Sequence, residues 1–436
     1  MDEKINTETY YFVGDDGFIY MHFPIRGYAY RTHPDNASLV KKLAQGIPLS
    51  KHECNHPLVV GLRKKALMGR ELKCPPAIRD LPEFRPIEAT LLLTESCNLA
   101  CSYCYAKATI HKFVPMTREV AKGAIDLVIK NAKTHKYKTA EFRFLGGGEP
   151  TLEWGLIVWA THYIRFRADE AGVSYFIRLI TNGVLINDEK ACWIAKHIHY
   201  VTLSCDILPD LQANRSFPNG KNSHKSVMRA AHLLCKHDVP CHFRTTISFA
   251  ATDRLQEMVE YTHKYTAVKA IRFEPMAEIG RASDTEMNKP AQQAFVDAFI
   301  AAYKLGKRYG ILVTCKMMNN IQRRSTRFCN VEFAITSEGN VAGCHRYSRR
   351  SNAGFDFYHI GKWDGQQFNF DIDKINALRR VDTHIFPQCQ SCFARWSCAS
   401  GCLSARMQKG EINQSGPLCH LTRELLKFSI TEALHA

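Results

Sequence analysis

The stretch Thr94-Glu95-Ser96-Cys97-Asn98-Leu99-Ala100-Cys101-Ser102-Tyr103-Cys104 decides the fold, because its three cysteines follow directly on the apolar run Leu91-Leu92-Leu93. Such a run predicts a buried strand, which puts the cysteines at its carboxyl end. Their spacing, Cys-x3-Cys-x2-Cys, lets three thiolates occupy three corners of a cubane iron–sulfur cluster, whereas a cluster held by protein alone takes four. Zinc also binds cysteines, but His111 is the only nearby candidate for a fourth zinc ligand. The spacing therefore favours an iron–sulfur cluster with one iron open to a small molecule.

The three cysteines resemble the signature of the radical S-adenosylmethionine (SAM) enzymes, which includes an aromatic residue, here Tyr103, just before the last cysteine. The resemblance implies that Cys97, Cys101 and Cys104 hold a 4Fe–4S cluster and that SAM chelates the open iron through its amino and carboxylate groups. It also implies that one electron cleaves SAM to methionine and a 5′-deoxyadenosyl radical, which abstracts a hydrogen atom from an unreactive C–H bond. We expect Tyr103 to line the SAM site.

The composition indicates a globular protein of a reducing compartment. A chain of 436 residues with 45% apolar residues is long enough for two or three domains. It has 17 cysteines, yet its N-terminus lacks the apolar stretch of an export signal, and no apolar run approaches the ~18 residues of a membrane span. Because disulfide frameworks are typical of short secreted chains, we expect a reduced, metal-loaded protein in the cytoplasm, away from membranes.

The charge balance points to an acidic partner. Lysine and arginine exceed aspartate and glutamate by 58 to 42, a formal net charge of +16. The densest basic runs, residues 323–327 and 346–350, lie in the cysteine-rich C-terminal third, where they would face either the substrate or only solvent. No RNA-binding signature accompanies the charge, so nucleic acid remains a minor option beside an acidic peptide.

We expect three domains, at residues 1–86, 87–310 and 311–436. The first reads as a small α+β domain, in which residues 10–13 and 18–23 form an antiparallel hairpin around an Asp-Gly turn and helices follow at 36–45 and 57–68. The third is rich in cysteine and ends in a helix at about 420–434.

Between residues 87 and 310, strand and helix patterns alternate. The expected strands are 89–94, 141–145, 175–181, 200–205, 242–249 and 269–274. The expected helices are 117–135, 155–172, 188–198, 223–237, 253–265 and 290–309. Successive βα units favour a parallel barrel, whose active site forms at the carboxyl ends of the strands, where the three cysteines stand. The resemblance implies the same fold class, an α/β fold with a partial (β/α)6 barrel open on one side.

Two strand ends match the SAM pocket of that family. The run at 144–150, Phe-Leu-Gly-Gly-Gly-Glu-Pro, ends the second strand; glycines let a backbone approach a ligand closely, and a carboxylate can hold an ammonium group. In radical SAM enzymes this motif binds the amino group of SAM, which implies that role for Gly147, Gly148 and Glu149. The turn at 180–183, Ile-Thr-Asn-Gly, implies in the same way that Asn182 lies near the SAM ribose.

The fourth strand ends in Leu203-Ser204-Cys205-Asp206, and Arg215 follows. Relatives show Ser-Leu-Asp-Gly-Pro here and a later arginine that meets the SAM carboxylate, which implies a place for Ser204 and Arg215 at the SAM site. The alternative for Arg215 is an ordinary surface arginine. Cys205 stands where relatives have leucine and Ile207 where they have glycine, so the conformation of this loop stays open.

Seven cysteines of the last third follow the pattern C-x9-G-x4-C … C-x2-C-x5-C-x3-C … C. The pattern resembles the SPASM domain, which holds two auxiliary 4Fe–4S clusters. It implies distal ligands at Cys389, Cys392, Cys398 and Cys419, and proximal ligands at Cys329, Cys344 and Cys402. Some relatives add a ligand at the position of Arg323, so here either Cys315 closes the proximal cluster or one iron stays open to substrate. The alternative for Cys389, Cys392, Cys398 and Cys402 is a zinc ribbon.

Together these motifs imply a SPASM-type radical SAM enzyme that abstracts a hydrogen from a side chain of a ribosomally made peptide and forms an oxidative C–C, C–S or C–O cross-link. A flavodoxin or ferredoxin would supply electrons, and three 4Fe–4S clusters and SAM are the implied cofactors. The alternatives are a sulfatase maturase that makes formylglycine, a peptide epimerase and a small-molecule radical SAM dehydrogenase. A purely electron-carrying iron–sulfur protein has no need of the Gly-Gly-Glu motif.

Two residues and one domain bear on that choice. Sulfatase-maturing relatives carry an aspartate base directly after the cysteine equivalent to Cys344, where this chain has His345, our candidate base unless it only packs there. Cys205 is the candidate hydrogen donor, as in some peptide epimerases, or else a core residue. The N-terminal domain is either a module that pairs a strand edge with an acidic leader peptide or a cap on the barrel.

Overall fold

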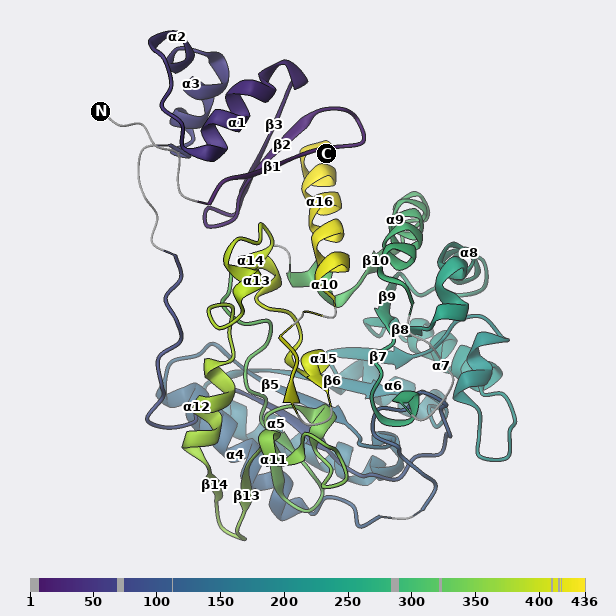
Figure 1. Ribbon diagram of the computed structural model, residues 1–436. Coiled ribbons are helices and arrows are strands. Elements are labelled where there is room, and N and C mark those ends of the chain that lie inside the picture. The colour runs from purple at the N-terminus through teal and green to yellow at the C-terminus, as the bar shows by residue number, and fades with distance from the viewer. Residues whose placement is uncertain are drawn as a thin grey trace.

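The computed structural model describes residues 8–68, 74–111, 113–283, 290–320, 324–408, 411–414, 416 and 418–435. Figure 1 shows a small N-terminal body above a larger one, with the C-terminal helix α16 (Cys419–His435) reaching from one to the other. A three-stranded sheet organises the small body and an 11-stranded sheet the large one. Arg323, at the start of one basic run, lies outside the described residues.

Parallel strands form the barrel wall in the order β10-β9-β8-β7-β6-β5-β4. They are β4 (Glu88–Leu92), β5 (Thr139–Leu145), β6 (Ser174–Thr181), β7 (Tyr200–Ser204), β8 (Cys241–Ile247), β9 (Ala270–Pro275) and β10 (Leu312–Thr314). The connecting helices are α4 (Arg118–Thr134), α5 (Trp154–Ala171), α6 (Asp188–His197), α7 (His224–Lys236), α8 (Leu255–Tyr265) and α9 (Gln292–Tyr309). The predicted α/β fold with a partial (β/α)6 barrel is confirmed; the short strand β10, which the sequence did not suggest, extends the open edge.

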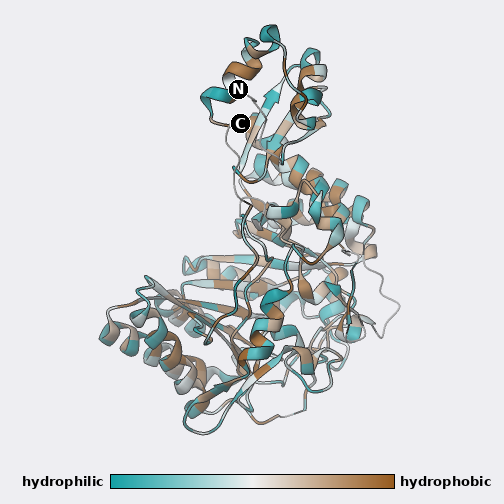
Figure 2. Ribbon diagram, turned by 60° about the vertical axis from the view of Figure 1, so that its left-hand side comes forward, coloured by the Kyte–Doolittle hydropathy of each residue, from teal (hydrophilic) through white to brown (hydrophobic). Residues whose placement is uncertain are grey.

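The strands have one apolar and one charged face. In β5, Ala140, Phe142 and Phe144 are fully buried, while Glu141 and Arg143 between them are half-buried. Because successive side chains of a strand point to opposite faces, the apolar set packs in the core with the helices and the charged set lines the other face. Helices likewise alternate between hydrophobic and hydrophilic segments along their length (Figure 2), as expected for helices with one buried side.

The large sheet continues past β4 into the C-terminal third. Strand β11 (Ala334–Ile335) pairs parallel to β4, and β12 (Asn340–Ala342), β13 (His359–Trp363) and β14 (Phe368–Phe370) follow antiparallel. A tight hairpin joins β11 to β12: Gly339 adopts φ +79°, and its N–H donates to the Thr336 carbonyl at 3.0 Å. Beyond β14 the described chain is built mainly of short helices, among them α12 (Ile372–Arg380) and α14 (Arg395–Cys398), before α16.

The N-terminal body is a three-stranded antiparallel sheet, β1 (Tyr10–Val13), β2 (Ile19–Phe23) and β3 (Tyr28–Thr32), followed by α1 (Ala37–Gln45), α2 (Lys51–Cys54) and α3 (Pro57–Lys64). The predicted hairpin of β1 and β2 is confirmed, whereas β3 was not expected. One face of β2 packs on the helices through Ile19, Met21 and Phe23. The other face packs through Tyr20 on α16 and on Ala394 of the cysteine-rich segment. None of the described helices is both long and apolar enough to cross a membrane.

Candidate active site

The three motif cysteines lie in the loop after β4, at the carboxyl ends of the parallel strands. Backbone hydrogen bonds fix the loop: the N–H groups of Cys97, Ala100 and Ser102 donate to carbonyls of Thr109, Ser216 and Asn214 at 2.8, 2.8 and 2.9 Å. Burial raises the pKa of the Cys97 thiol to about 12 and that of Cys101 to about 11, and the neighbouring thiols add to both shifts. The thiols therefore converge. A metal cluster that binds thiolates would relieve this unfavourable ionisation, so the residues fit an iron–sulfur cluster.

The glycine loop after β5 lies directly against the cysteine loop. The N–H groups of Gly148 and Glu149 donate to the carbonyls of Thr94 and Ser96, each at 2.9 Å. A Cβ on Gly148 would lie 1.8 Å from the Ser96 carbonyl oxygen, so only glycine allows this approach. Gly147 has room for a side chain, with no neighbour nearer than 3.7 Å.

Glu149 is held as a buried carboxylate beside Cys97. It is 2% exposed and accepts hydrogen bonds from the Thr181 hydroxyl at 2.6 Å and the Asn182 N–H at 2.8 Å. Burial raises its pKa, and its charge in turn raises the pKa of Cys97. Asn182 donates through its side chain to Asn98 of the cysteine loop at 2.8 Å. A buried acid next to the thiols suits the ammonium group of SAM, and Asn98 is a site residue that no sequence motif indicated.

Tyr103, Asp206 and Arg215 form a second buried group on the same side of the barrel. The Tyr103 hydroxyl donates to Asp206, and the Arg215 Nε donates to the other carboxylate oxygen at 3.1 Å. The Arg215 guanidinium also lies 5.1 Å from the centre of the Tyr103 ring. Arg215 is 7% exposed, so the surface-arginine alternative is wrong. Ile207 adopts φ +65°, so the loop keeps the left-handed conformation for which relatives use glycine, despite its β-branched side chain.

Ser204 and Cys205 end up on opposite faces of the strand end. Ser204 is half-buried, whereas Cys205 is fully buried within the apolar core. The Cys205 sulfur accepts from the Ile207 N–H at 3.2 Å, and burial raises the pKa of its thiol to about 12. Since Ser204 and Asp206 alternate with Cys205, the structure does not bring the Cys205 thiol to the face that carries the SAM-site candidates.

The seven cysteines of the C-terminal third gather in two groups. Burial raises the pKa of Cys389 to about 11 and that of Cys398 to about 12, and the neighbouring thiols of Cys392 and Cys419 add to both shifts. In the second group, burial raises the pKa of Cys329 to about 11 and also raises the pKa of Cys344, and the neighbouring thiol of Cys402 adds to both shifts. Both groups are the ones that the SPASM resemblance implied.

Cys315 is placed differently from the proximal group. It is fully buried in the apolar core, where burial raises the pKa of its thiol to about 12; the charge of Glu274 adds to this shift and that of Arg272 opposes it. Its neighbour Lys316 instead faces the thiols, since its charge lowers the pKa of both Cys329 and Cys402.

His345 lies beside the proximal cysteines and is held by Glu332. The Nδ1 atom and the backbone N–H of His345 both contact the same Glu332 oxygen at 2.8 Å. Although burial opposes it, the pairing with His345 lowers the pKa of Glu332 to about 2. Ligand atoms of Glu332, Cys344 and His345 lie within 4.8 Å of one another. The ring of His345 also meets that of Tyr105, next to Cys104, at 5.8 Å between centroids, so His345 lies between the two cysteine sites.

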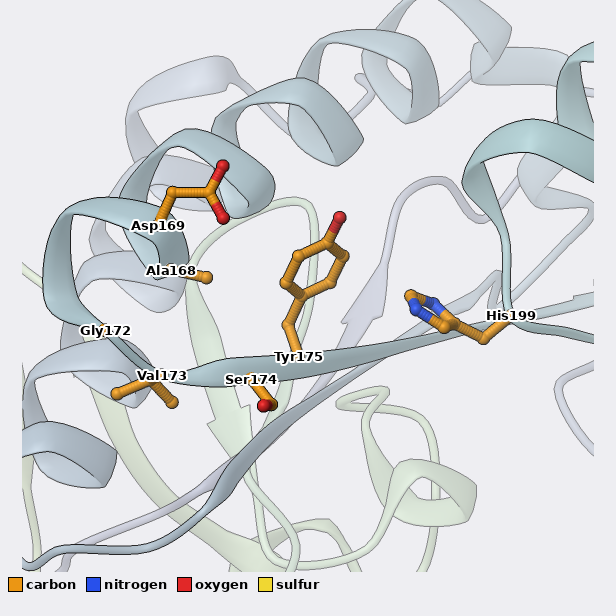
Figure 3. A pocket seen from close by; sticks show the side chains of 7 residues that line it. All are labelled: Ala168, Asp169, Gly172, Val173, Ser174, Tyr175 and His199. Carbon is orange, nitrogen blue, oxygen red and sulfur yellow. The ribbon is translucent and has the colours of Figure 1, made fainter.

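A surface cavity of about 540 Å³ lies elsewhere (Figure 3). It is lined by Asp169 and Gly172 at the end of α5, by Ser174 and Tyr175 at the start of β6, and by His199. These residues mark the amino ends of the strands, opposite the cysteine loop, and none of the predicted site residues lines the cavity. Because barrel enzymes act at the carboxyl ends, this cavity is not the candidate active site.

The family described as the Radical SAM superfamily matches residues 91–262. This part of the chain is a radical SAM domain. Proteins of that superfamily use a 4Fe–4S cluster and SAM.

Three relatives share parts of the sequence. The uncharacterized protein MJ0907 of Methanocaldococcus jannaschii is 30% identical over 42% of this chain, which spans 60% of that protein. The cysteine-type anaerobic sulfatase-maturating enzyme of Clostridium perfringens is 22% identical over 72% of this chain and 88% of its own. The sporulation killing factor maturation protein SkfB of Bacillus subtilis is 24% identical over 61% of each chain.

Two solved structures share the fold. A structure described as native anSMEcpe with bound AdoMet superposes with a TM-score of 0.65 at 18% identity and covers 80% of this chain and 99% of its own. Streptococcus suis SuiB bound to S-adenosylmethionine superposes with a TM-score of 0.52 at 12% identity and covers 96% of this chain and 100% of its own. The radical SAM fold is thereby confirmed.

Proposed function

We propose, on the premise of the radical SAM domain in residues 91–262, that this protein is a maturase that modifies a side chain of a peptide or protein. The observation that carries the proposal is the convergence of Cys97, Cys101 and Cys104 beside the buried carboxylate of Glu149, at the carboxyl ends of the parallel strands. Two relatives whose names describe maturation of a protein or a peptide favour this substrate class.

The residues of the site have separate tasks. Cys97, Cys101 and Cys104 would hold the cluster, and Glu149 would orient the SAM ammonium group while the Gly148 backbone keeps the two loops together. When bound, cluster and SAM supply a 5′-deoxyadenosyl radical. The buried Asp206–Arg215 pair keeps Tyr103 in place within the cysteine loop.

The C-terminal cysteines would hold two auxiliary 4Fe–4S clusters. A cluster held by Cys329, Cys344 and Cys402 would supply an acceptor for the electron that a net oxidation of the substrate releases, which favours a cross-link. Our preferred product is therefore a peptide with a new C–C, C–S or C–O bond, and a flavodoxin or ferredoxin is the proposed electron donor. No disulfide joins any of the 17 cysteines, all of which lie in the described part of the chain, and this suits the reducing cytoplasm that we propose for this protein.

A formylglycine-forming sulfatase maturase is the second candidate, because the Clostridium perfringens relative covers most of this chain. His345 would then act as the base, with Glu332 fixing the orientation of its ring. An epimerase that uses Cys205 is less well supported, because this thiol lies in the apolar core.

The N-terminal body is our proposed recognition module for a leader peptide. Its sheet has β1 and β3 as edge strands, and an extended peptide can add to such an edge through main-chain hydrogen bonds. The net charge of +16 favours an acidic leader.

The test has two stages, both under anaerobic conditions. Reconstituted protein is first reduced with SAM and assayed for 5′-deoxyadenosine; the Cys97/Cys101/Cys104→Ala variant should form none, whereas Cys192→Ala, a matched change in α6, should behave as wild type. A small peptide encoded beside the gene is then co-expressed with the protein in deuterated water, and its molecular mass is measured by mass spectrometry. A loss of about two hydrogens supports a cross-link, one solvent deuterium without mass loss supports epimerisation, and an unchanged peptide refutes the peptide substrate.

A further inference from the structure

Arginines gather on the inner face of the barrel, and all but one of them have a partner. Four are paired: Arg143 with Glu88 at 2.6 Å, Arg178 with the Tyr200 ring at 5.3 Å, Arg272 with Glu274 at 2.5 Å, and Arg215 with Asp206 at 3.1 Å. The guanidinium of Arg244, on β8, makes no hydrogen bond, ion pair or ring contact within the part of the chain that the structure describes. A half-buried, unpaired cation of this kind is costly unless an anion joins it.

Arg244 lies level with the SAM-site candidates. In the parallel sheet it pairs in register with Ser204 of β7 and Arg272 of β9, and register partners project from the same face. Two residues further along that face, the N–H of Thr246 donates to Asp206 at 3.4 Å. Burial lowers the pKa of Arg244 and the charges of Arg346, Arg272 and Arg215 lower it further, although the charge of Glu274 on β9 opposes the shift. Its guanidinium therefore stands between the SAM site, marked by Arg215, and the proximal cysteines, marked by Arg346.

A second unsatisfied donor lies beside it. The hydroxyl of Tyr105 is buried and has no hydrogen-bond partner among the residues that the structure describes. Arg346 and Arg244 are near enough to lower its pKa, although burial raises that pKa overall. Both Arg244 and the Tyr105 hydroxyl are donors, so an acceptor is missing at this point.

The acids nearby are already engaged. Glu274 accepts from Arg272 Nε at 2.5 Å and from the Lys316 N–H at 3.1 Å, and Glu332 is bound to His345. Neither acid forms an ion pair with Arg244 within the described part of the chain, so an anion that contacts both Arg244 and Tyr105 would enter with a reactant.

We propose that Arg244, assisted by the Tyr105 hydroxyl, binds a carboxylate of the peptide substrate and so holds the segment to be modified between the SAM site and the proximal cysteines. The planar guanidinium suits a carboxylate, which it can bind through two parallel hydrogen bonds. The carboxylate belongs either to an aspartate or glutamate side chain or to the C-terminus of the peptide. The inference rests on the proposed function and narrows its substrate class to peptides with an acid at the reaction site.

The test uses the reconstituted holoprotein with SAM and short blocked peptides as probes. Anaerobic titration calorimetry measures the binding affinity of two pairs of peptides. One pair is N-acetyl-Gly-Glu-Gly-amide and the same peptide with Gln in place of Glu, and the other is N-acetyl-Gly-Gly-Gly acid and its amide. We expect about tenfold tighter binding of one acid than of its neutral twin, the value of one charge-assisted contact. The Glu pair reports a side-chain source and the acid–amide pair a C-terminal source. In Arg244→Gln the ratio between the affinities of the acid and neutral peptides should fall to about one. Arg244→Lys keeps the charge and should retain part of this preference for the acid.

The matched control is Arg178→Gln. It removes the same charge from the same face, four residues or roughly 13 Å deeper along the strands. A ratio that falls equally in Arg178→Gln would show a general field effect and overturn the proposal, as would equal binding of acid and neutral probes by wild type. A tenfold loss of SAM affinity in Arg244→Gln would place the guanidinium on the cofactor and also overturn it. Wild type that forms no 5′-deoxyadenosine refutes the proposed function instead, which keeps the two failures distinct.

Discussion

Replacing Gly148 by alanine should separate the cysteine loop from the glycine loop. The new Cβ would lie 1.8 Å from the Ser96 carbonyl oxygen and 2.4 Å from its carbon, and because both atoms are backbone, no side-chain rotation relieves the clash. Two hydrogen bonds of 2.9 Å join the loops at this point, from Gly148 to Thr94 and from Glu149 to Ser96. Since Ser96 precedes Cys97, any separation also moves a predicted cluster ligand away from Glu149.

The size of the effect follows from these distances. Real Cβ contacts are essentially never shorter than 3.0 Å, so the two backbones must move apart by about 1 Å or more, which takes both hydrogen bonds past 3.5 Å. A buried backbone group left without a partner costs about 1–3 kcal/mol, so we expect a loss of about 2–4 kcal/mol in the free energy of unfolding. For a domain of this size the loss corresponds to a Tm lower by roughly 5–15 °C.

Thermal unfolding of the cluster-free protein and SAM binding by the reconstituted protein measure the two consequences separately. Gly147→Ala is the matched control, because its Cβ would meet nothing nearer than 3.7 Å and its Tm should stay near that of wild type. If Gly148→Ala unfolded within 2 °C of wild type and bound SAM equally well, the close approach of the two loops would not be what holds the site together.

Three further predictions concern other parts of the chain. Burial lowers the pKa of His22 to about 4, so below the usual value of about 6.5 the unfolded state binds more protons; stability should fall by about 2 kcal/mol between pH 7 and 5, and His22→Phe should flatten this part of a Tm–pH profile. Exposed Lys136 adopts φ +55° after α4, so Lys136→Gly should raise the free energy of unfolding in urea by about 0.5–1 kcal/mol, and no gain would argue against strain there. Cys315→Ala should keep the full iron content of the reconstituted protein, because the thiol lies in the apolar core near Glu274 and Arg272; a loss of iron would make Cys315 a cluster ligand after all.

The sequence predicted the barrel well because its strands and helices carry strong periodic signals. In β5 the alternation Ala140, Phe142, Phe144 against Glu141 and Arg143 is local and strict, so the strand and its buried face could be read without knowledge of the fold. Strands β3 and β10 carry no such signal: β3 (Tyr28–Thr32) is mostly half-exposed, and β10 has three residues. Such short or mixed segments become strands only when a neighbouring strand offers its edge.

Motif spacing indicated which cysteines gather, but not what surrounds them. The pairing of His345 with Glu332 joins residues 13 positions apart on either side of a hairpin, and the bond between Asn182 and Asn98 joins two barrel loops. Neither pair has a spacing that a motif would capture. The sequence could not single out Arg244 for a different reason. In the sequence it is one more charged residue on an alternating strand, and only the structure shows that it has no ion-pair partner among the described residues, unlike the arginines around it.

The N-terminal body also makes contacts that no sequence motif predicts. Its sheet rests on the segment that carries the predicted distal ligands: the ring of Phe393, next to Cys392, meets Tyr10 and His22 at 6.3 Å each, and Arg395 pairs with Glu8 at 3.8 Å. The aromatic faces of Tyr10 and His22 therefore have a partner only while residues 392–395 keep their conformation. Since four thiols fix that segment once they bind a common group, loss of the group should loosen the N-terminal body as well. Conversely, Phe393→Ala removes ring packing without removing a thiol, so it should weaken docking of the N-terminal body while leaving the iron content unchanged.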